Sequence, residues 1–299
     1  MNNRQASRSW VIRTAAWVAG KLPGGAREAL YRLGPLTGLI RRALSSAAPK
    51  GMSEIQVAAG PLQGVTLVLN LEEEKDLWLG NYELALWEAA KLLVQPGMTI
   101  FDVGANIGYM SLGLARLVGS GGRVIAIEPL PENVKRLHAH LALNNDLAER
   151  VKVIEAAAGE GPGRASFLVH ASGGMGKLED ASGRQGAYDG QIEVSVVSLD
   201  SLVFDRGLPV PGLIKLDVEG GEALALLGAR RLIRDARPVL FIEFHGPQAA
   251  SQCWDMLIEE AYRVRRMGPG LPLVEKPGQL GWKAYVVASY LGELPGGEP

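Results

Sequence analysis

Two acidic residues stand at the ends of consecutive apolar runs of this sequence. Asp102 lies in the run 99–103, which leads into the glycine-containing loop 104–108, and Glu128 ends the next run, 124–128. We expect both runs to be parallel strands, whose carboxyl ends meet at the ligand-binding edge of an open α/β sheet. Either acid alone is also typical of helix capping. The two acids together with the glycine loop predict a binding site.

The composition of the loop indicates which ligand it binds. Gly104 and Gly108 let main-chain groups come close to a ligand, but Asn106 stands where a dinucleotide-binding fingerprint has its second glycine. An NAD-dependent oxidoreductase is therefore the weaker alternative. The Asp102 carboxylate would repel a pyrophosphate but suits the ammonium of a methionine moiety, through a direct or water-mediated bond, and Glu128 can accept both hydroxyls of a ribose. This chemistry points to S-adenosylmethionine as the cofactor.

A second group of titratable residues lies in, or directly after, two later apolar runs. It consists of Lys215, Asp217, Glu219, Glu243 and His245. Period-two alternation puts Glu243 and His245 on one side of their strand. Methyl transfer is an in-line displacement that needs an aligned acceptor and, for a hydroxyl, a group that removes its proton. An ordinary histidine pKa of about 6.5 suits His245 to that role. We therefore predict that this set of five residues is catalytic.

Other interpretations of the second group stay open. Asp217 and Glu219 could cap a helix, and His245 could be a surface histidine in a loop. The four residues Asp217, Glu219, Glu243 and His245 offer oxygen and imidazole ligands that suit a divalent cation. No spacing among them is diagnostic of a metal site, so we expect no metal.

The pattern of apolar runs predicts the fold class. Short runs rich in β-branched residues alternate with helical segments, which is typical of a parallel sheet with helices on both faces. The expected strands are 99–103, 124–128, 151–154, 213–217 and 238–243. We also expect strands at 164–169 and 193–199 around a glycine-rich stretch, 171–190, and an antiparallel hairpin of 262–264 and 284–288 at the sheet edge. The sequence thus predicts an α/β fold with a mostly parallel central sheet.

Composition divides the chain into three segments. Residues 1–50 carry nine basic side chains against one acidic side chain and predict a basic helical extension, whereas the whole chain has a net charge of −1. Residues 51–97 predict a hairpin and a helix that lead into the core, and 98–299 the catalytic domain. No apolar run reaches the roughly 18–20 residues that cross a bilayer, and no signal peptide is evident. We expect a cytoplasmic protein, with peripheral membrane contact through 1–50 as an alternative to simple packing.

The motifs together resemble the FkbM family of methyltransferases. The resemblance rests on the segments 101–109, 127–129, 213–220 and 241–245 in the expected order, and it runs from about residue 77 to 245. It implies a Rossmann-like class I methyltransferase fold, S-adenosylmethionine as donor, and O-methylation of sugars, polyketides or other secondary metabolites. By resemblance, the donor-binding positions are Asp102, Gly104, Asn106, Gly108 and Glu128, and Ala156 and Ala157 border the adenine.

The acceptor is less defined than the donor. We expect a small-molecule or glycan acceptor, but the glycine-rich stretch 171–190 prevents transfer of acceptor contacts from the family. An RNA methyltransferase is one alternative, although the chain after residue 50 is acidic overall and shows no RNA-binding module, so nucleic acid is not the expected partner. A non-catalytic binding protein that retains the fold is another. The oligomeric state is not predicted.

Overall fold

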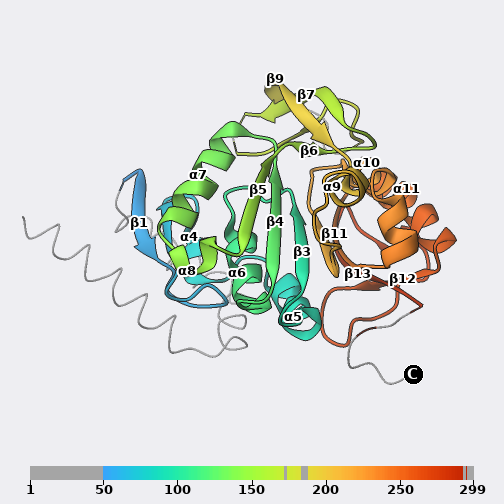
Figure 1. Cartoon of the computed structure of the whole chain (residues 1–299), viewed down its shortest axis with the longest axis horizontal. Helices are drawn as coiled ribbons and strands as arrows, with labels where there is room; N and C mark the ends of the chain where they lie inside the picture. The colour runs from blue at the N-terminus through green and yellow to red at the C-terminus, as the bar shows by residue number, and fades with distance from the viewer. Residues whose placement is uncertain (1–49, 172–173, 183–187, 292–293, 295–299) are drawn as a thin grey trace, which may run out of the picture. The chain divides into compact units, whose positions relative to one another are not determined.

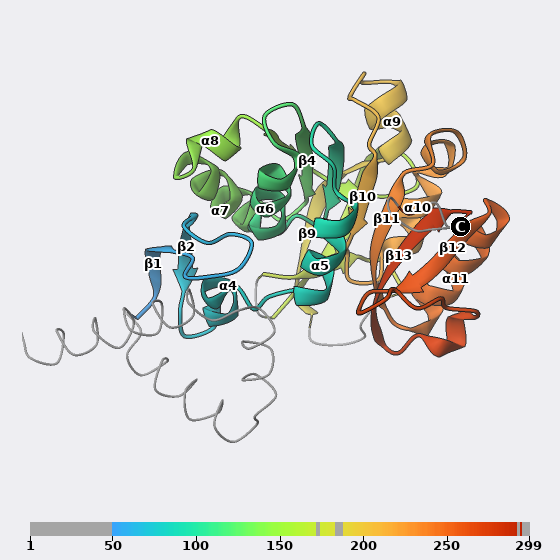
Figure 2. The same cartoon turned by 90° about the horizontal axis from the view of Figure 1, so that it is seen from below.

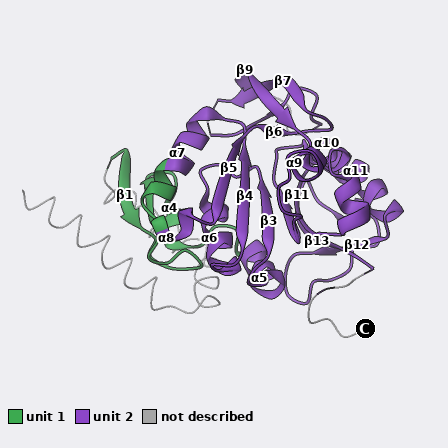
Figure 3. Cartoon of the chain, in the orientation of Figure 1, with its two compact units in different colours: residues 1–84, 139–145 green, residues 85–138, 146–299 purple. Residues whose placement is uncertain are grey.

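The chain divides into two compact units. The computed structural model describes residues 50–171, 174–182, 188–291 and 294. The units comprise residues 1–84 with 139–145, and residues 85–138 with 146–299 (Figure 3). The predicted helical extension 1–50 lies outside the described residues, apart from Lys50. Across the described part of the chain, no helix is long and apolar enough to cross a membrane.

The first unit contains a small antiparallel hairpin, as predicted. Its elements are β1 (Met52–Gln56), β2 (Thr66–Asn70) and α4 (Lys75–Leu79). Asn144 extends the hydrogen bonding of β2, because its side chain accepts from the Thr66 amide at 3.0 Å and donates to the Thr66 carbonyl at 2.7 Å. At Gly80, φ is +69° and a Cβ would lie 2.0 Å from the Ala59 carbonyl oxygen, so the chain passes there only with glycine.

The second unit is built on a seven-stranded sheet of order β12-β13-β11-β10-β3-β4-β5 (Figure 1). Its strands are β3 (Thr99–Val103), β4 (Arg123–Glu128), β5 (Val151–Glu155), β10 (Leu213–Leu216), β11 (Val239–His245), β12 (Tyr262–Arg266) and β13 (Lys283–Tyr290). The strands from β11 to β5 pair in parallel, while β13 is antiparallel to both β11 and β12. The predicted parallel sheet with an antiparallel edge is therefore confirmed.

Helices cover both faces of this sheet. They are α5 (Leu84–Leu93), α6 (Tyr109–Val118), α7 (Pro131–Ala142), α8 (Asn145–Ala148), α9 (Leu199–Phe204), α10 (Glu222–Leu227) and α11 (Pro247–Glu259), with the π-helical turn η1 (Leu232–Ala236) and the 3-10 turn η2 (Pro277–Gln279). Figure 2 shows α6 and α10 on opposite sides of the strands. Helices α9, α10 and α11 share one apolar cluster with the sheet, which includes Phe101, Val103 and the buried Cys253. Since strand residues alternate between faces, Asp102 points to the other face, toward α6.

A second, four-stranded sheet of order β6-β9-β7-β8 follows β5 in the chain. Its strands are β6 (Ala157–Ala158), β7 (Gly163–His170), β8 (Gly176–Leu178) and β9 (Tyr188–Val197). The predicted strands 164–169 and 193–199 correspond to β7 and β9, but β9 begins earlier than predicted, at Tyr188, and its predicted end is also wrong. The Ser198 hydroxyl accepts a hydrogen bond from the Ser201 amide and starts α9 at Leu199. A serine before an apolar run is a typical helix N-cap, so local chemistry ends the strand there.

Candidate functional site

The loop between β3 and α6 packs directly against the end of β10. Gly104 has φ of +75°, and a Cβ at this position would lie 1.8 Å from the carbonyl oxygen of Asp217. Gly108 also has a left-handed conformation, and it is the N-cap of α6. Asn106 is exposed, and its side-chain oxygen accepts from the Ile107 amide at 2.7 Å. Gly104 is thus needed for close contact between two parts of the protein itself, a reason that the sequence did not reveal.

Asp102 is a fully buried member of an ion pair. Its carboxylate lies 3.1 Å from the Lys215 ammonium and accepts a hydrogen bond of 2.6 Å from the Ser111 hydroxyl of α6. The two charged residues lie side by side because the register of β3 and β10 pairs them. The nearby carboxylates outweigh the effect of burial and raise the pKa of Lys215. Asp102 has no exposed surface in this structure, so its predicted contact with the methionine ammonium stays a prediction.

Glu128 is held by three hydrogen-bond donors at the end of β4. One carboxylate oxygen accepts from the Asn106 amide at 2.8 Å, and the other accepts from the Leu130 amide at 3.0 Å and the Asn133 side chain at 3.1 Å. Burial raises the pKa of Glu128, and these bonds partly offset that effect. A carboxylate has about four acceptor positions. Three donors therefore leave Glu128 room to accept about one further hydrogen bond, such as that of one ribose hydroxyl, rather than the bonds of both hydroxyls that we expected from the sequence.

Residues 174–182, a described segment of the glycine-rich stretch, reach both predicted groups of residues. The Gly174 carbonyl accepts from the side chains of Asn106 and Asn133, at 3.4 and 3.2 Å. At the other end, the Ser182 amide donates to the Gly220 carbonyl at 3.2 Å. This segment links the surroundings of Glu128 with the loop that follows Asp217.

The second predicted group of residues comes together around His245. The Nδ1 atom lies 2.8 Å from Glu222 Oε1, a residue of α10 that the sequence analysis did not single out. The Nε2 atom lies 3.2 Å from Glu243, 3.7 Å from Asp217 and 3.8 Å from Glu219. The predicted proximity of Glu243 and His245 is confirmed. We call these five residues the acid–histidine cluster.

The acidic neighbours change how His245 titrates. Burial alone would lower its pKa, but the hydrogen bonds with Glu222 and Glu243 and the surrounding negative charge outweigh burial and raise the pKa of His245 to about 10. The expectation of an ordinary pKa near 6.5 is therefore wrong, and His245 is protonated at neutral pH in this arrangement. Burial raises the pKa of Asp217 to about 6, although the neighbouring Lys215 opposes this effect.

Glu243 has a second positive neighbour at the start of β13. The Lys283 ammonium forms a close ion pair with its carboxylate, because the antiparallel register of β11 and β13 places Lys283 opposite His245. Burial would raise the pKa of Glu243, but the bonds from His245 and Lys283 outweigh it and lower the pKa. The side chain of Lys283 is 52% exposed, so this positive charge reaches the cluster from the solvent side.

The segment of the chain that contains these site residues matches a known protein family. The family model of the Methyltransferase FkbM domain matches residues 102–267, which is more than half of the chain and spans both groups of site residues. The chain belongs to the FkbM methyltransferase family. The predicted resemblance is confirmed, and the mostly parallel sheet with its antiparallel edge is the Rossmann-like class I methyltransferase fold expected of it.

Three relatives of this FkbM-family chain show how far the similarity extends. It is 33% identical over 159 residues to the 31-O-demethyl-FK506 methyltransferase FkbM of Streptomyces tacrolimicus, a match that covers 45% of this chain and 60% of that protein. The FkbM methyltransferase structure from Methylobacillus flagellatus has 21% identity and a TM-score of 0.44, over 74% of this chain and 53% of that one. An O-methyltransferase structure from Thermotoga maritima has 18% identity and a TM-score of 0.42, over 84% and 81%. The chain thus spans less than two thirds of the first two proteins.

The FkbM-family chain places the predicted adenine-bordering residues in its apolar interior. Ala156 and Ala157 are both buried, and the Ala156 amide donates to the Glu128 carbonyl at 3.2 Å. Ala156 therefore lies next to Glu128 in space. The contact of both alanines with adenine stays a prediction.

The sequence analysis did not identify four residues of the site. They are Ser111, Asn133, Glu222 and Lys283. Ser111 and Asn133 lie near the starts of the helices that follow β3 and β4, a position from which a polar side chain can reach a strand end. That signal could have drawn attention to these two residues. Glu222 and Lys283 depend on how α10 and β13 pack, which no local pattern reveals.

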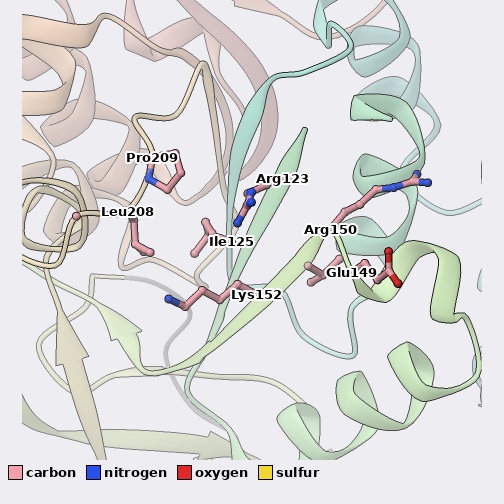
Figure 4. Close-up of a pocket in the computed structure, with 9 residues that line it drawn as sticks. Arg123, Ile125, Glu149, Arg150, Lys152, Leu208 and Pro209 are labelled. Carbon is pink, nitrogen blue, oxygen red and sulfur yellow. The ribbon is translucent and has the colours of Figure 1, made fainter. Parts of the chain in front are cut away.

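A surface hollow lies at the opposite edge of the sheet. It has a volume of about 450 Å³ and is lined by Arg123, Ile125, Glu149, Arg150, Val151, Lys152, Gly207, Leu208 and Pro209 (Figure 4). Arg123 and Val151 begin β4 and β5, so the hollow opens at the amino ends of these strands. None of its lining residues belongs to the predicted site, which lies at the carboxyl ends.

Proposed function

We propose that this FkbM-family chain is an S-adenosylmethionine-dependent methyltransferase that methylates a hydroxyl group of a sugar, glycan or secondary metabolite. Family membership supports methyl transfer. The Streptomyces tacrolimicus relative is named as a 31-O-demethyl-FK506 methyltransferase, and this name supports an oxygen atom as the acceptor.

The position of one buried ammonium group, that of Lys215, is the main support for this proposal. Lys215 Nζ donates to the Gly104 carbonyl at 2.9 Å and lies 3.1 Å from Asp102 and 3.7 Å from Asp217. The predicted donor loop and the acid–histidine cluster are therefore joined through a single charged group at the carboxyl edge of the sheet, where open α/β sheets bind their ligands. A donor and an acceptor bound on either side of Lys215 would lie next to each other.

The residues on the donor side fit S-adenosylmethionine. Bound there, this cofactor supplies a methyl group on a positively charged sulfur. Glu128 offers its remaining acceptor position to a ribose hydroxyl, and the three donors that hold its carboxylate fix the direction of that bond. The exposed Asn106 and the main chain of the loop 104–108 offer polar groups to the rest of the donor. Preformed groups of this kind lose little freedom on binding.

The acid–histidine cluster serves the acceptor. A hydroxyl that gains a methyl group must release its proton, and a protonated His245 does not accept it. The carboxylates of Asp217 and Glu219 are 24% and 20% exposed, in contrast to the buried Glu222 and Glu243. They are therefore the groups that a hydroxyl reaches, and the proton passes to one of their oxygens. His245 orients these carboxylates.

Calorimetry with the purified chain tests the donor side. S-adenosylmethionine and S-adenosylhomocysteine are expected to bind, NAD is not, and Glu128→Ala should weaken S-adenosylhomocysteine binding at least tenfold. The exposed Glu259→Gln on α11 is the control and should leave binding unchanged. Tight NAD binding, or no binding of either sulfur compound, would show that the cofactor is wrong.

Transfer of a radiolabelled methyl group tests the acceptor side. The labelled donor is offered with a panel of monosaccharides, glycans and macrolides that carry free hydroxyls, and incorporation into at least one member is expected. Asp217→Asn and Glu219→Gln should each be compared with the wild type, and at least one should lose turnover about a hundredfold while S-adenosylhomocysteine affinity stays within about threefold. Normal turnover of both variants would contradict the assignment of the proton acceptor.

A further inference from the structure

The geometry points to a divalent-cation site in the acid–histidine cluster, formed by Asp217, Glu243 and His245. One ligand atom from each of these residues, two carboxylate oxygens and an imidazole nitrogen, lies within 4.8 Å of the other two. For its role in catalysis this site rests on the proposed function, but its existence rests on the cluster alone. It revises the expectation from the sequence that no metal binds.

The separations of these atoms suit a metal ion. His245 Nε2 lies 3.2 Å from Glu243 Oε1 and 3.7 Å from Asp217 Oδ1. An ion with bonds of about 2.1 Å places neighbouring ligand atoms about 3.0–3.4 Å apart in octahedral or tetrahedral geometry. A movement of about half an ångström by the half-buried Asp217 side chain would bring its oxygen into that range of His245 Nε2. Glu219, at 3.8 Å from the same nitrogen, lies just outside the set.

The other side of the imidazole is arranged as in a metal-ligating histidine. Such histidines hold their second ring nitrogen in a hydrogen bond, commonly to a carboxylate, which fixes the tautomer and turns the free nitrogen toward the metal. Here the fully buried Glu222 accepts from His245 Nδ1 at 2.8 Å and is itself fixed by the Gly220 amide at 3.0 Å. Glu222 comes from α10, outside the ligand set, and it fixes the ring with Nε2 turned toward Glu243 and Asp217. A metal ion bound at Nε2 would take the place of the proton on this nitrogen, which is released to solvent.

The cluster already attracts a cation. The Lys283 ammonium forms an ion pair with Glu243 Oε1, the oxygen that lies 3.2 Å from His245 Nε2. Its side chain is half exposed, so it can move into solvent when another cation arrives. Lys283 therefore marks a position where the protein holds positive charge and from which a metal ion would displace it.

The ligand types define the class of ion. Carboxylate oxygens favour hard ions such as Mg²⁺ and Mn²⁺, whereas an imidazole nitrogen favours the later transition metals. A set of two carboxylates and one imidazole suits a first-row divalent transition ion and should prefer Mn²⁺ to Mg²⁺. With Asp217 bound to the ion, Glu219 is the carboxylate left to take the acceptor proton.

Electron paramagnetic resonance with Mn²⁺ tests the site on the full chain, stripped of metal with a chelator and kept free of donor. Loss of the free-Mn²⁺ signal should show one bound ion per chain, and spin-echo spectra should show coupling to one imidazole nitrogen. Asp217→Asn is expected to weaken binding at least tenfold, whereas Glu259→Gln should bind as the wild type does. Lys283→Met, which removes the competing ammonium, should raise the affinity at least threefold.

Several outcomes would overturn the site. Absence of Mn²⁺ binding would mean that Lys215, Lys283 and the protonated His245 alone balance the charge of these carboxylates. Equal binding by the wild type and Asp217→Asn, or bound Mn²⁺ without nitrogen coupling, would place the ion elsewhere. Circular dichroism of Asp217→Asn confirms that this variant is folded. S-adenosylhomocysteine calorimetry on the same samples is independent of the ion, so failure of the metal site and failure of the proposed cofactor can be told apart.

Discussion

The candidate site has two halves, the donor side around Glu128 and the acid–histidine cluster. They stabilise their negative charges in different ways. On the donor side, the Glu128 carboxylate is held by two main-chain amides and the Asn133 amide group, all neutral donors that belong to the fold. In the acid–histidine cluster, four carboxylates surround one imidazole, and the balance depends on Lys215, Lys283 and the proton on His245. The donor side is therefore preformed, whereas the cluster is sensitive to any cation or acceptor that enters.

Loss of the ammonium that joins the two halves should have the largest effect. Lys215→Met leaves Asp102 buried without its positive partner, so the free energy of unfolding should fall by about 3–5 kcal/mol. Urea denaturation measures this change. Arg164→Met is the matched control, because it breaks an exposed ion pair with Glu193 and should cost less than about 1 kcal/mol. Equal losses in the two variants would mean that burial of the Lys215 pair is unimportant.

A substitution that disturbs the contact between the two halves should have the second-largest effect on stability. In Gly104→Ala, the new methyl group would collide with the Asp217 carbonyl and the residue would keep a left-handed conformation, so we expect a loss of about 2–4 kcal/mol. Gly97 has a similar φ of +85° but no atom within 4 Å of a Cβ. Gly97→Ala should therefore lose only about 1–2 kcal/mol. Denaturation of both variants separates the collision from the backbone strain.

A neutral amide in place of the Glu128 carboxylate should weaken donor binding and leave the acid–histidine cluster unchanged. Glu128→Gln presents an NH₂ group to one of the main-chain amides that the carboxylate now accepts from. Hydrogen bonds to charged groups contribute about 1.5–3 kcal/mol, so S-adenosylhomocysteine affinity should fall at least tenfold. Asp217→Asn, on the other half, should change that affinity less than about threefold. If calorimetry finds the two variants equally weakened, the halves are not separate in function.

The smallest expected effect concerns Asn133. Its side chain donates to Glu128 and to the Gly174 carbonyl, but two amides still hold the carboxylate when it is removed. Asn133→Ala should weaken S-adenosylhomocysteine binding about three- to tenfold, as expected for one or two hydrogen bonds. Lys135→Ala, at an exposed position of the same helix, serves as the control. An unchanged affinity in Asn133→Ala would show that Glu128 is oriented without it.

Much of the fold follows from local patterns. The boundaries of β3, β4 and β5 were predicted to within one residue because apolar, β-branched runs are bounded there by glycine, proline and charged residues. The error at the end of β9 arose because Ser198 looks like a strand residue until it is recognised as a helix cap. The grouping of Glu243 with His245 was also predictable, since it needs only the period of a strand.

The chemistry of the site was predicted less well. His245 was expected to titrate near neutrality, but Glu222 and Glu243 on either side of the ring raise its pKa to about 10. Glu222 comes from a helix and Lys283 from an antiparallel strand, and neither position follows from spacing along the chain. Gly104 was assigned to ligand approach, whereas its surroundings show that it packs on Asp217.

The sequence by itself determined the order of the strands along the chain, the family, and which acids end the strands of the parallel sheet. These are local properties, set by residue type and period. Tertiary structure decided that Asp102 faces Lys215, that Glu222 orients His245, and that Lys283 reaches Glu243. Each of these pairs depends on strand register or helix packing, which bring together residues far apart in the chain. Charges interact strongly only when they meet at short range and out of water, so the chemistry of the site depends on those long-range contacts.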